Sequence, residues 1–183
     1  MLVIRIALWL LGGVMLGGIV HFATVLLLPS MATQDAYSRL APITPVNAVT
    51  AIAPPSPEKA VMPFMDPAFA WSVCRYDLSE GPLKFSVPVS QAYTSVSFYT
   101  RTDVPYYAIN DRAAGRRMIE LDLMTTEQRN ELPENEEITA ADRLIVESPT
   151  TTGLIVIKSL APEPGLLQAA RSALASARCS SVT

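Results

Sequence analysis

The feature that most constrains this chain is an uninterrupted apolar segment close to its first residue. Residues Ile6–Leu28 contain no Asp, Glu, Lys or Arg over 23 positions. A helix needs about 20 apolar residues to cross the hydrocarbon core of a bilayer, so the segment predicts one transmembrane helix. A cleaved secretory signal is the alternative, because Ser30-Met31-Ala32 offers a small-x-small cleavage site. The apolar region of a signal spans about 7–15 residues, so the greater length favours an uncleaved anchor.

The charges on either side of this segment predict its orientation. Arg5 and the terminal amine precede it, whereas the first basic residue after it, Arg39, lies eleven positions beyond Leu28. Basic residues beside a membrane helix favour the cytoplasmic side. We therefore expect residues 1–5 in the cytoplasm, residues 6–28 in the membrane and the rest of the chain on the other side.

One face of the predicted helix carries small and polar residues. Gly13, Gly17 and His21 follow one another at intervals of four, which places them on one face. A G-x-x-x-G pattern lets a second helix approach closely, and an ionisable residue inside a membrane usually faces a partner. This favours a helix–helix contact with another copy or another membrane protein. The alternative is that glycine is simply common in membrane helices and that His21 is neutral.

The next 42 residues, 29–70, contain eight prolines. Proline fixes φ and removes a backbone donor, so regular structure is not expected to run through this stretch. We expect a short juxtamembrane helix over Met31–Leu40, capped by Ser30, followed by an extended spacer. The apolar residues at its end, Phe64, Met65 and Phe69 with Trp71 just after them, indicate that the last part docks on the domain that follows.

From Trp71 the pattern changes to short runs rich in Val, Ile, Tyr, Phe and Thr, which is typical of strands. The expected strands are Ser72–Leu78, Leu83–Val89, Tyr93–Thr100, Tyr106–Asn110, Met118–Met124, Leu144–Glu147 and Leu154–Leu160. The last of these is apolar on both faces, which indicates a central strand. Helices are expected from Thr125 or Thr126 to Leu132 and over Pro164–Arg178, the second with one buried face. The chain is thus predicted to be α+β, with a sandwich-like antiparallel domain over 71–179 that ends in a helix, and a tail at 180–183.

Two cysteines bracket this domain, Cys74 near its start and Cys179 at its end. In an oxidising compartment such a pair predicts a disulfide. Two separate buried thiols are the alternative.

Three stretches of the domain resemble a known family. They are Tyr76-Asp-Leu-Ser-Glu-Gly-Pro-Leu83, the run from Val87-Pro88 to Tyr93-Thr-Ser-Val-Ser-Phe-Tyr99, and Ile109-Asn-Asp-Arg-Ala-Ala-Gly115. The region that contains them, about Trp71–Cys179, is similar to the DUF1254-type domain of short membrane-anchored proteins that are common in alphaproteobacteria. The resemblance implies a Gram-negative inner membrane and a periplasmic domain, and it provides no catalytic residues. Larger relatives join this domain to a second one, DUF1214, which we do not expect in this chain.

The residue content excludes several kinds of chemistry. The one histidine is His21, so the outer domain has no histidine for acid–base catalysis or metal binding. The formal net charge of −3 leaves no basic footprint for nucleic acid. We therefore expect no metal, no cofactor and no catalytic residue. Carboxylates such as Asp103 and Asp111 keep open the alternative of a carboxylate-dependent enzyme, or an accessory subunit of one.

A basic turn is the candidate site for binding. Arg112, Arg116 and Arg117 flank Gly115, and Tyr106 and Tyr107 come shortly before them. Arginine can bind carboxylate or phosphate, and both residue types are favoured at interfaces. The alternative is an ordinary solvated turn. Taken together, the sequence predicts a non-enzymatic, membrane-tethered module that binds a partner protein or an envelope component.

Overall fold

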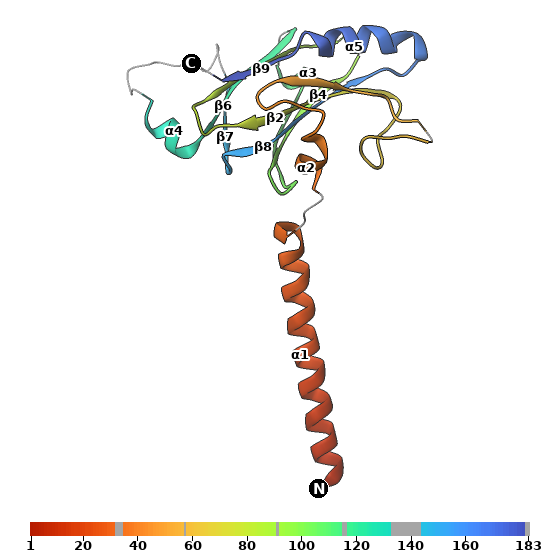
Figure 1. Cartoon of the computed structure of the whole chain (residues 1–183), viewed down its shortest axis with the longest axis vertical. Helices are drawn as coiled ribbons and strands as arrows, with labels where there is room; N and C mark the ends of the chain where they lie inside the picture. Colours follow the sequence, from red (N-terminus) through yellow and green to blue (C-terminus); the bar gives the residue numbers. More distant parts are fainter. Residues whose placement is uncertain (32–34, 57, 91, 115–116, 133–143, 182–183) are drawn as a thin grey trace. The chain divides into compact units, whose positions relative to one another are not determined.

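The computed structural model describes residues 1–31, 35–56, 58–90, 92–114, 117–132 and 144–181. The chain divides into two compact units, Met1–Gln34 and Asp35–Thr183 (Figure 1). The first contains a single helix, and the second contains all the strands. This agrees with the predicted α+β class, in which an apolar helix precedes a β-rich domain.

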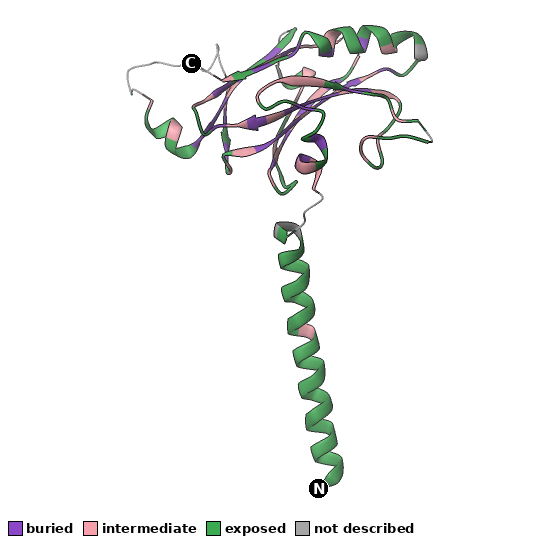
Figure 2. Ribbon diagram, viewed as in Figure 1, coloured by how far each residue is buried: buried purple, intermediate pink, exposed green. Residues whose placement is uncertain are grey.

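Helix α1, Leu2–Met31, contains every described residue of the first unit except Met1. Its residues 2–28 have a mean hydropathy of 2.1 and none is buried, so the helix is long and apolar enough to cross a membrane (Figure 2). At 1.5 Å per residue, 30 residues extend for about 45 Å. A Cβ added at Gly13 or Gly17 would meet nothing within 4 Å, so this face is open.

The second unit contains two sheets. The larger is antiparallel throughout, with the strand order β1-β2-β8-β4-β5. Its strands are β1 (Val49–Ile52), β2 (Phe69–Asp77), β8 (Thr152–Leu160), β4 (Thr94–Thr100) and β5 (Pro105–Asn110). Strand β8 lies at its centre, as its two apolar faces predict.

The smaller sheet has the order β7-β6-β3-β9. Its strands are β7 (Leu144–Ser148), β6 (Met118–Thr125), β3 (Leu83–Pro88) and β9 (Arg178–Ser181). Strands β6 and β7 run parallel, so the sandwich is not antiparallel throughout. The chain between them begins with helix α4, Thr126–Asn130, which is capped by a reciprocal pair of hydrogen bonds between Thr125 and Gln128.

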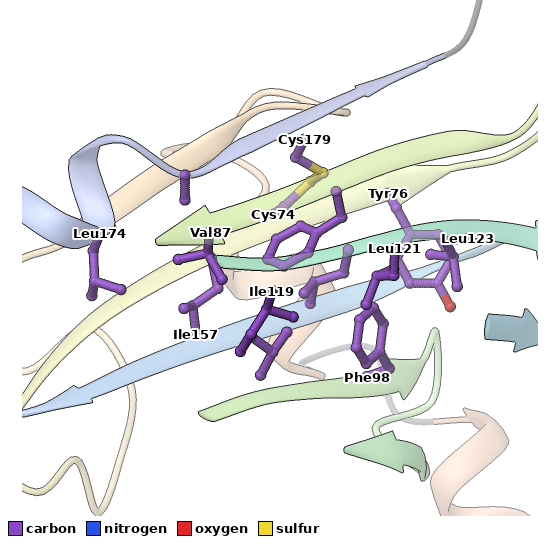
Figure 3. Packing of buried hydrophobic residues seen from close by; sticks show 14 of the residues in the cluster. Cys74, Tyr76, Val87, Phe98, Ile119, Leu121, Leu123, Ile157, Leu174 and Cys179 are labelled. Carbon is purple, nitrogen blue, oxygen red and sulfur yellow. A yellow bond between two sulfur atoms is a disulfide. The ribbon is translucent and has the colours of Figure 1, made fainter. Parts of the chain in front are cut away.

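The main core lies between the inner faces of the two sheets (Figure 3). The predicted alternation holds on the smaller sheet, where Leu83, Phe85 and Val87 of β3 are buried and Lys84 is exposed. On the larger sheet, Phe98 stacks edge-on against Phe85 at 6.2 Å between ring centroids. The aromatic pair therefore joins β4 of one sheet to β3 of the other.

The end of the chain differs from the predicted long helix and tail. A 3₁₀ turn, η1 (Pro164–Leu166), leads into helix α5 (Leu167–Ala175), which buries Ala170 and Leu174 and packs against strands of both sheets. The chain then returns as β9 and pairs with β3, so Ser180 and Ser181 belong to a strand. The helical pattern does not reach Arg178 because the next residue, Cys179, turns into the core.

The predicted disulfide between Cys74 and Cys179 is confirmed. It joins β2 of one sheet to β9 of the other, with 6.5 Å between the Cα atoms and 105 residues between the cysteines. Both cysteines are buried. Closing a loop of this length stabilises the fold by at most about 5 kcal/mol on the chain-entropy model.

Residues 35–56 and 58–70 are folded onto the domain, unlike the extended spacer predicted for 29–70. Helix α2, Ala36–Leu40, begins after Asp35, whose carboxylate accepts a hydrogen bond from the Ser38 amide, so the predicted start at Met31 with a Ser30 cap is also corrected. Strand β1 extends the larger sheet beside β2. A second apolar cluster forms on the outer face of that sheet, where Tyr37, Leu40 and Ile52 cover Val73 and Leu154. The expected docking of Met65 is confirmed, since it packs against this cluster, whereas the expected docking of Phe64 is wrong, because its side chain is exposed.

Tyr37 is held against the sheet by two arginines. The guanidinium carbons of Arg75 and Arg101 lie 4.3 and 4.4 Å from the centre of its ring. Arg101 also forms an ion pair with Asp35 and donates to the Ser38 hydroxyl at 3.1 Å. Burial acts to raise the pKa of Asp35, but the hydrogen bonds from Ser38 and the charge of Arg101 lower it overall. These contacts fix the first turn of the domain to its outer sheet face.

Candidate binding cleft

A cleft of about 500 Å³ lies on the outer face of the larger sheet. It lies beyond the part of that face that the second cluster covers. Its lining comes from β2, β8, β4 and β5, and from the chain on either side of them. The lining residues are Phe64, Asp66, Phe69, Trp71, Tyr93, Ser95, Ser97, Ala108, Ile109, Asn110, Ala113 and Lys158.

Aromatic rings form one wall of the cleft. Alternation along β2 places Phe69 and Trp71 on the same face, where their ring centroids are 6.4 Å apart. The Trp71 indole N–H donates to the Asp66 carbonyl at 3.1 Å, which fixes the ring. Lys158 lies opposite Trp71 in the sheet register, with its ammonium 4.8 Å from the ring centre. This wall is therefore held in place before any ligand binds.

The floor of the cleft is made by short side chains. Ser97 on β4 is paired with Ala108 on β5, and Ser95 is paired with Asn110. Short residues on adjacent strands, next to a wall of large rings, leave the sheet face hollow. The floor offers hydroxyl and amide groups, and the lining contains one carboxylate, Asp66, and one ammonium, Lys158. The cleft suits a polar ligand of balanced charge that has a face able to stack on an aromatic ring.

The tyrosines predicted for the binding turn pack against the core. Strand β5 has an irregularity opposite Phe98 and Tyr99, where Tyr107 and Pro105 are their partners and Tyr106 is the extra residue. Such a bulge lets neighbouring residues point to one side. Both rings lie against Phe98, at centroid distances of 6.2 Å for Tyr106 and 5.7 Å for Tyr107.

The arginines of the predicted site are placed differently. Arg112, in helix α3 (Asp111–Ala114), and Arg117 are exposed, whereas Arg116 lies outside the described residues. Ala113, the neighbour of Arg112, lines the cleft. The predicted turn therefore borders the cleft without its tyrosines. Sequence reasoning missed Trp71, Ser97 and Lys158, and their alternation on neighbouring strands is the signal that could have found them.

The Tyr106 hydroxyl belongs to a hydrogen-bonded cluster. The Tyr76 hydroxyl is fully buried and lies 3.2 Å from the Tyr106 hydroxyl, 2.9 Å from the Ser148 hydroxyl and 3.2 Å from the Tyr99 carbonyl. Gly153 makes room for this cluster, because a Cβ there would clash with both Tyr76 and the Tyr99 carbonyl. Burial raises the pKa of Tyr106 above its usual value, and the neighbouring Tyr76 raises it further.

The carboxylates named in the sequence analysis do not face one another in a cleft. Asp103, at a positive φ of 62°, accepts a hydrogen bond from the Ala36 amide at 3.1 Å, and Asp111 is the first residue of α3. A hollow of about 290 Å³ on the smaller sheet includes Glu120 and Asp122. Two cations, Lys84 and Arg178, line the same hollow and balance their charge. Within the described ranges, no group of three His, Cys, Asp or Glu residues is placed to hold a metal ion.

The comparisons with known proteins agree with the resemblance. The model of the family described as "Protein of unknown function (DUF1254)" matches residues 46–181, and the chain belongs to this family. The match begins at 46 and so includes β1, which lies before the predicted boundary at Trp71. No curated protein matches the sequence.

Two solved structures match parts of this chain. The VPA0106 protein from Vibrio parahaemolyticus matches 80% of this chain with a TM-score of 0.59 at 13% identity. An uncharacterized protein from Burkholderia cenocepacia matches 69% with a TM-score of 0.48 at 14% identity. The chain spans 34% of the length of each of these proteins. The Vibrio protein therefore shows that this fold also occurs within a longer chain.

The Tyr106 cluster predicts a loss of stability at alkaline pH. An unfolded tyrosine ionises near pH 10, whereas the pKa of Tyr106 in the folded chain is raised. The unfolded state therefore releases this proton first, so stability that is complete below about pH 10 is lost above it. Tyr106→Phe should lower the free energy of unfolding by about 1 kcal/mol at pH 8, through the lost hydrogen bond to Tyr76.

The same variant should lose less stability than the wild type between pH 8 and pH 11. Urea unfolding of the full chain in detergent, followed by fluorescence, measures both effects. Tyr93→Phe is the control, because Tyr93 is exposed and should change neither value. Parallel pH profiles for Tyr106→Phe and the wild type would contradict the assignment.

Proposed function

We propose that this chain is a membrane-tethered, non-enzymatic binding module of the bacterial envelope. Helix α1 stays in the inner membrane as a single-pass anchor, and the DUF1254 domain lies in the periplasm. The observation that carries the proposal is the cleft of about 500 Å³, with its aromatic wall and its floor of serine and asparagine. Pockets of 300–1,000 Å³ are the usual size for small ligands.

Three observations support the tether and the compartment. Residues 2–28 of α1 are apolar and unburied, and Arg5 stands at their N-terminal side. The Cys74–Cys179 disulfide is of the kind that persists in oxidising compartments such as the periplasm. The cytoplasm would keep such a pair reduced.

The lining of the cleft supports binding in preference to catalysis. Catalytic sites bring together titratable groups at matched distances, whereas this lining has one carboxylate and one ammonium among rings and hydroxyls. The balanced charge favours an uncharged polar ligand over a nucleotide or a free phosphate. Rings such as Trp71 and Tyr93 supply stacking surface, and Ser95, Ser97 and Asn110 supply hydrogen bonds. Arg112 is exposed and next in the chain to the lining residue Ala113, so it is available to a longer ligand.

Helix α1 adds a second proposed contact. Gly13 and Gly17 leave one face of the helix without side-chain bulk, and His21 lies on the same face. We propose that this face packs against a second membrane helix, from another copy or from a partner. The module would then be brought to its partner in the plane of the membrane.

The proposed topology predicts the outcome of fusing reporters after Thr183. An alkaline phosphatase fusion, which is active only outside the cytoplasm, should be active. A fluorescent protein that matures only in the cytoplasm should be dark at the same position. Moving Arg5 to the other flank, as Arg5→Ala with Thr33→Arg, should weaken the phosphatase signal, because the orienting charge is displaced. A fluorescent cytoplasmic reporter would contradict the topology.

The proposed ligand site predicts a matched pair of outcomes. Ser97→Arg fills the floor of the cleft, whereas Ser86→Arg places the same side chain on the outer face of the other sheet. The full chain is extracted from membranes and examined by native mass spectrometry. The wild type and Ser86→Arg should carry an added ligand mass that Ser97→Arg has lost. Equal spectra from all three chains would contradict a ligand in this cleft.

A further inference from the structure

An apolar loop carries the most exposed large hydrophobic side chain in the described part of the domain. Met62-Pro63-Phe64-Met65 precedes β2, and Phe64 is fully exposed, at 103% of its reference surface. Met62 and Met65, on either side, pack against the second cluster. The loop is therefore fixed to the domain on both sides of Phe64, and its tip exposes the phenyl ring.

The backbone of this tip is held in an unusual conformation. Phe64 has a φ of 58°, in the left-handed region that bulky residues rarely adopt. Strained backbone persists where the surrounding structure fixes it, and it concentrates at functional sites. Here the strained position displays a ring that makes no contact with the core.

The loop lies beside the first helix of the domain. Together with α2 it encloses a mainly apolar groove of about 380 Å³, whose lining includes Ala36, Met62, Phe64 and Val156 as well as the charged Asp103 and Lys158. The Ala36 amide is hydrogen-bonded to Asp103, and the next residue along that hairpin, Val104, is also exposed. Phe64 and Val104 therefore both flank the point where the chain enters the domain.

The length of the chain limits how far this point can lie from the membrane. Helix α1 ends at Met31 and the domain begins at Asp35, four residues later. Four steps of 3.8 Å between Cα atoms reach about 15 Å at most. If α1 spans the bilayer, as in the proposed function on which this inference rests, Asp35 at the start of α2 stays within that reach of the helix end.

We propose that the Phe64 loop, together with Val104, inserts into the interface of the bilayer and forms a second, shallow anchor for the domain. The occupant of this surface is the boundary between lipid headgroups and acyl chains, where an apolar face is buried by about 5–10 Å. Exposed aromatic residues favour this layer, and the apolar groove behind the ring continues the surface. The domain is thereby held with one side facing the membrane, which leaves it no free rotation on its tether.

The test measures the depth of single positions in the full chain, reconstituted into phosphatidylcholine vesicles. A polarity-sensitive NBD dye is attached to Phe64→Cys, Leu28→Cys or Lys84→Cys, while the native cysteines stay in their disulfide. Leu28 belongs to the apolar helix, and Lys84 is exposed on the smaller sheet. Lipid with a doxyl quencher near the headgroup end of the acyl chain is then added.

The dye at Phe64→Cys should lose fluorescence on adding the quencher, as Leu28→Cys does, and Lys84→Cys should keep it. In a chain labelled at Val104→Cys, Phe64→Ser should reduce the loss, because the ring that holds the loop in the lipid is gone. If Leu28→Cys is quenched but Phe64→Cys behaves like Lys84→Cys, the second anchor is refuted and the tether stands. Protection of Phe64→Cys from aqueous iodide without quenching by lipid would refute it in favour of a protein partner. An unquenched Leu28→Cys would refute the tether itself, and the second anchor with it.

Discussion

The larger sheet has apolar residues on both faces, and the organisation of the domain follows from the need to cover them. Strand β8 alternates Ile155 and Ile157 on the inner face with Leu154 and Val156 on the outer face. The smaller sheet covers the inner face. The outer face is covered by the residues that follow helix α1, with Tyr37, Leu40 and Ile52 at their centre. Burying side chains of this size stabilises the fold by about 1.5–3 kcal/mol each, so the covering segment is part of the domain.

The second cluster covers only part of the outer face of the larger sheet, and the cleft lies on the part that it does not cover. Where the second cluster ends, the outer face of the sheet changes from Leu154 and Val156 to Ser95 and Ser97, which do not need to be buried. Trp71 lies on this border, packing against the cluster on one side and forming the wall of the cleft on the other. One part of the outer face therefore carries apolar side chains that the second cluster buries, and the other part carries the polar side chains that form the floor of the cleft.

The covalent and polar links of the domain hold the two sheets in register around this arrangement. The disulfide joins β2 to β9, and the Tyr76 hydroxyl joins β2 to β4, β5 and β7. Strand β2 takes part in both links. Of its outward-facing residues, Trp71 forms part of the cleft wall and Arg75 stacks on the ring of Tyr37. Movements of the cleft and of the covering segment are thus limited by the same strand.

Much of the fold follows from local patterns, and the differences have physical causes. Seven strands and the disulfide could be predicted, because period-two alternation and cysteine pairing are visible in the sequence. Strand β1 could not, because it is short and lies among prolines, and the helix expected over Met31–Leu40 proved to be only Ala36–Leu40; contacts with Val73 and Leu154 fix this segment on the sheet. The inward turn of Tyr106 and Tyr107 depends on a bulge that alternation does not show. The cleft needs four strands in a known order, which no local pattern provides.

The most direct test of this account is hydrogen exchange across residues 35–52 of the full chain in lipid nanodiscs. The Asn47 amide donates to the Arg75 carbonyl at 2.7 Å, and β1 is paired with β2 throughout, so these amides should exchange as slowly as those of β2. Tyr37→Ala should speed exchange in this segment while β3, which lies in the other sheet, stays protected. Exchange at the rate of an unstructured peptide in the wild type would contradict the account, because the segment would then be a spacer and the outer sheet face would lack its cover.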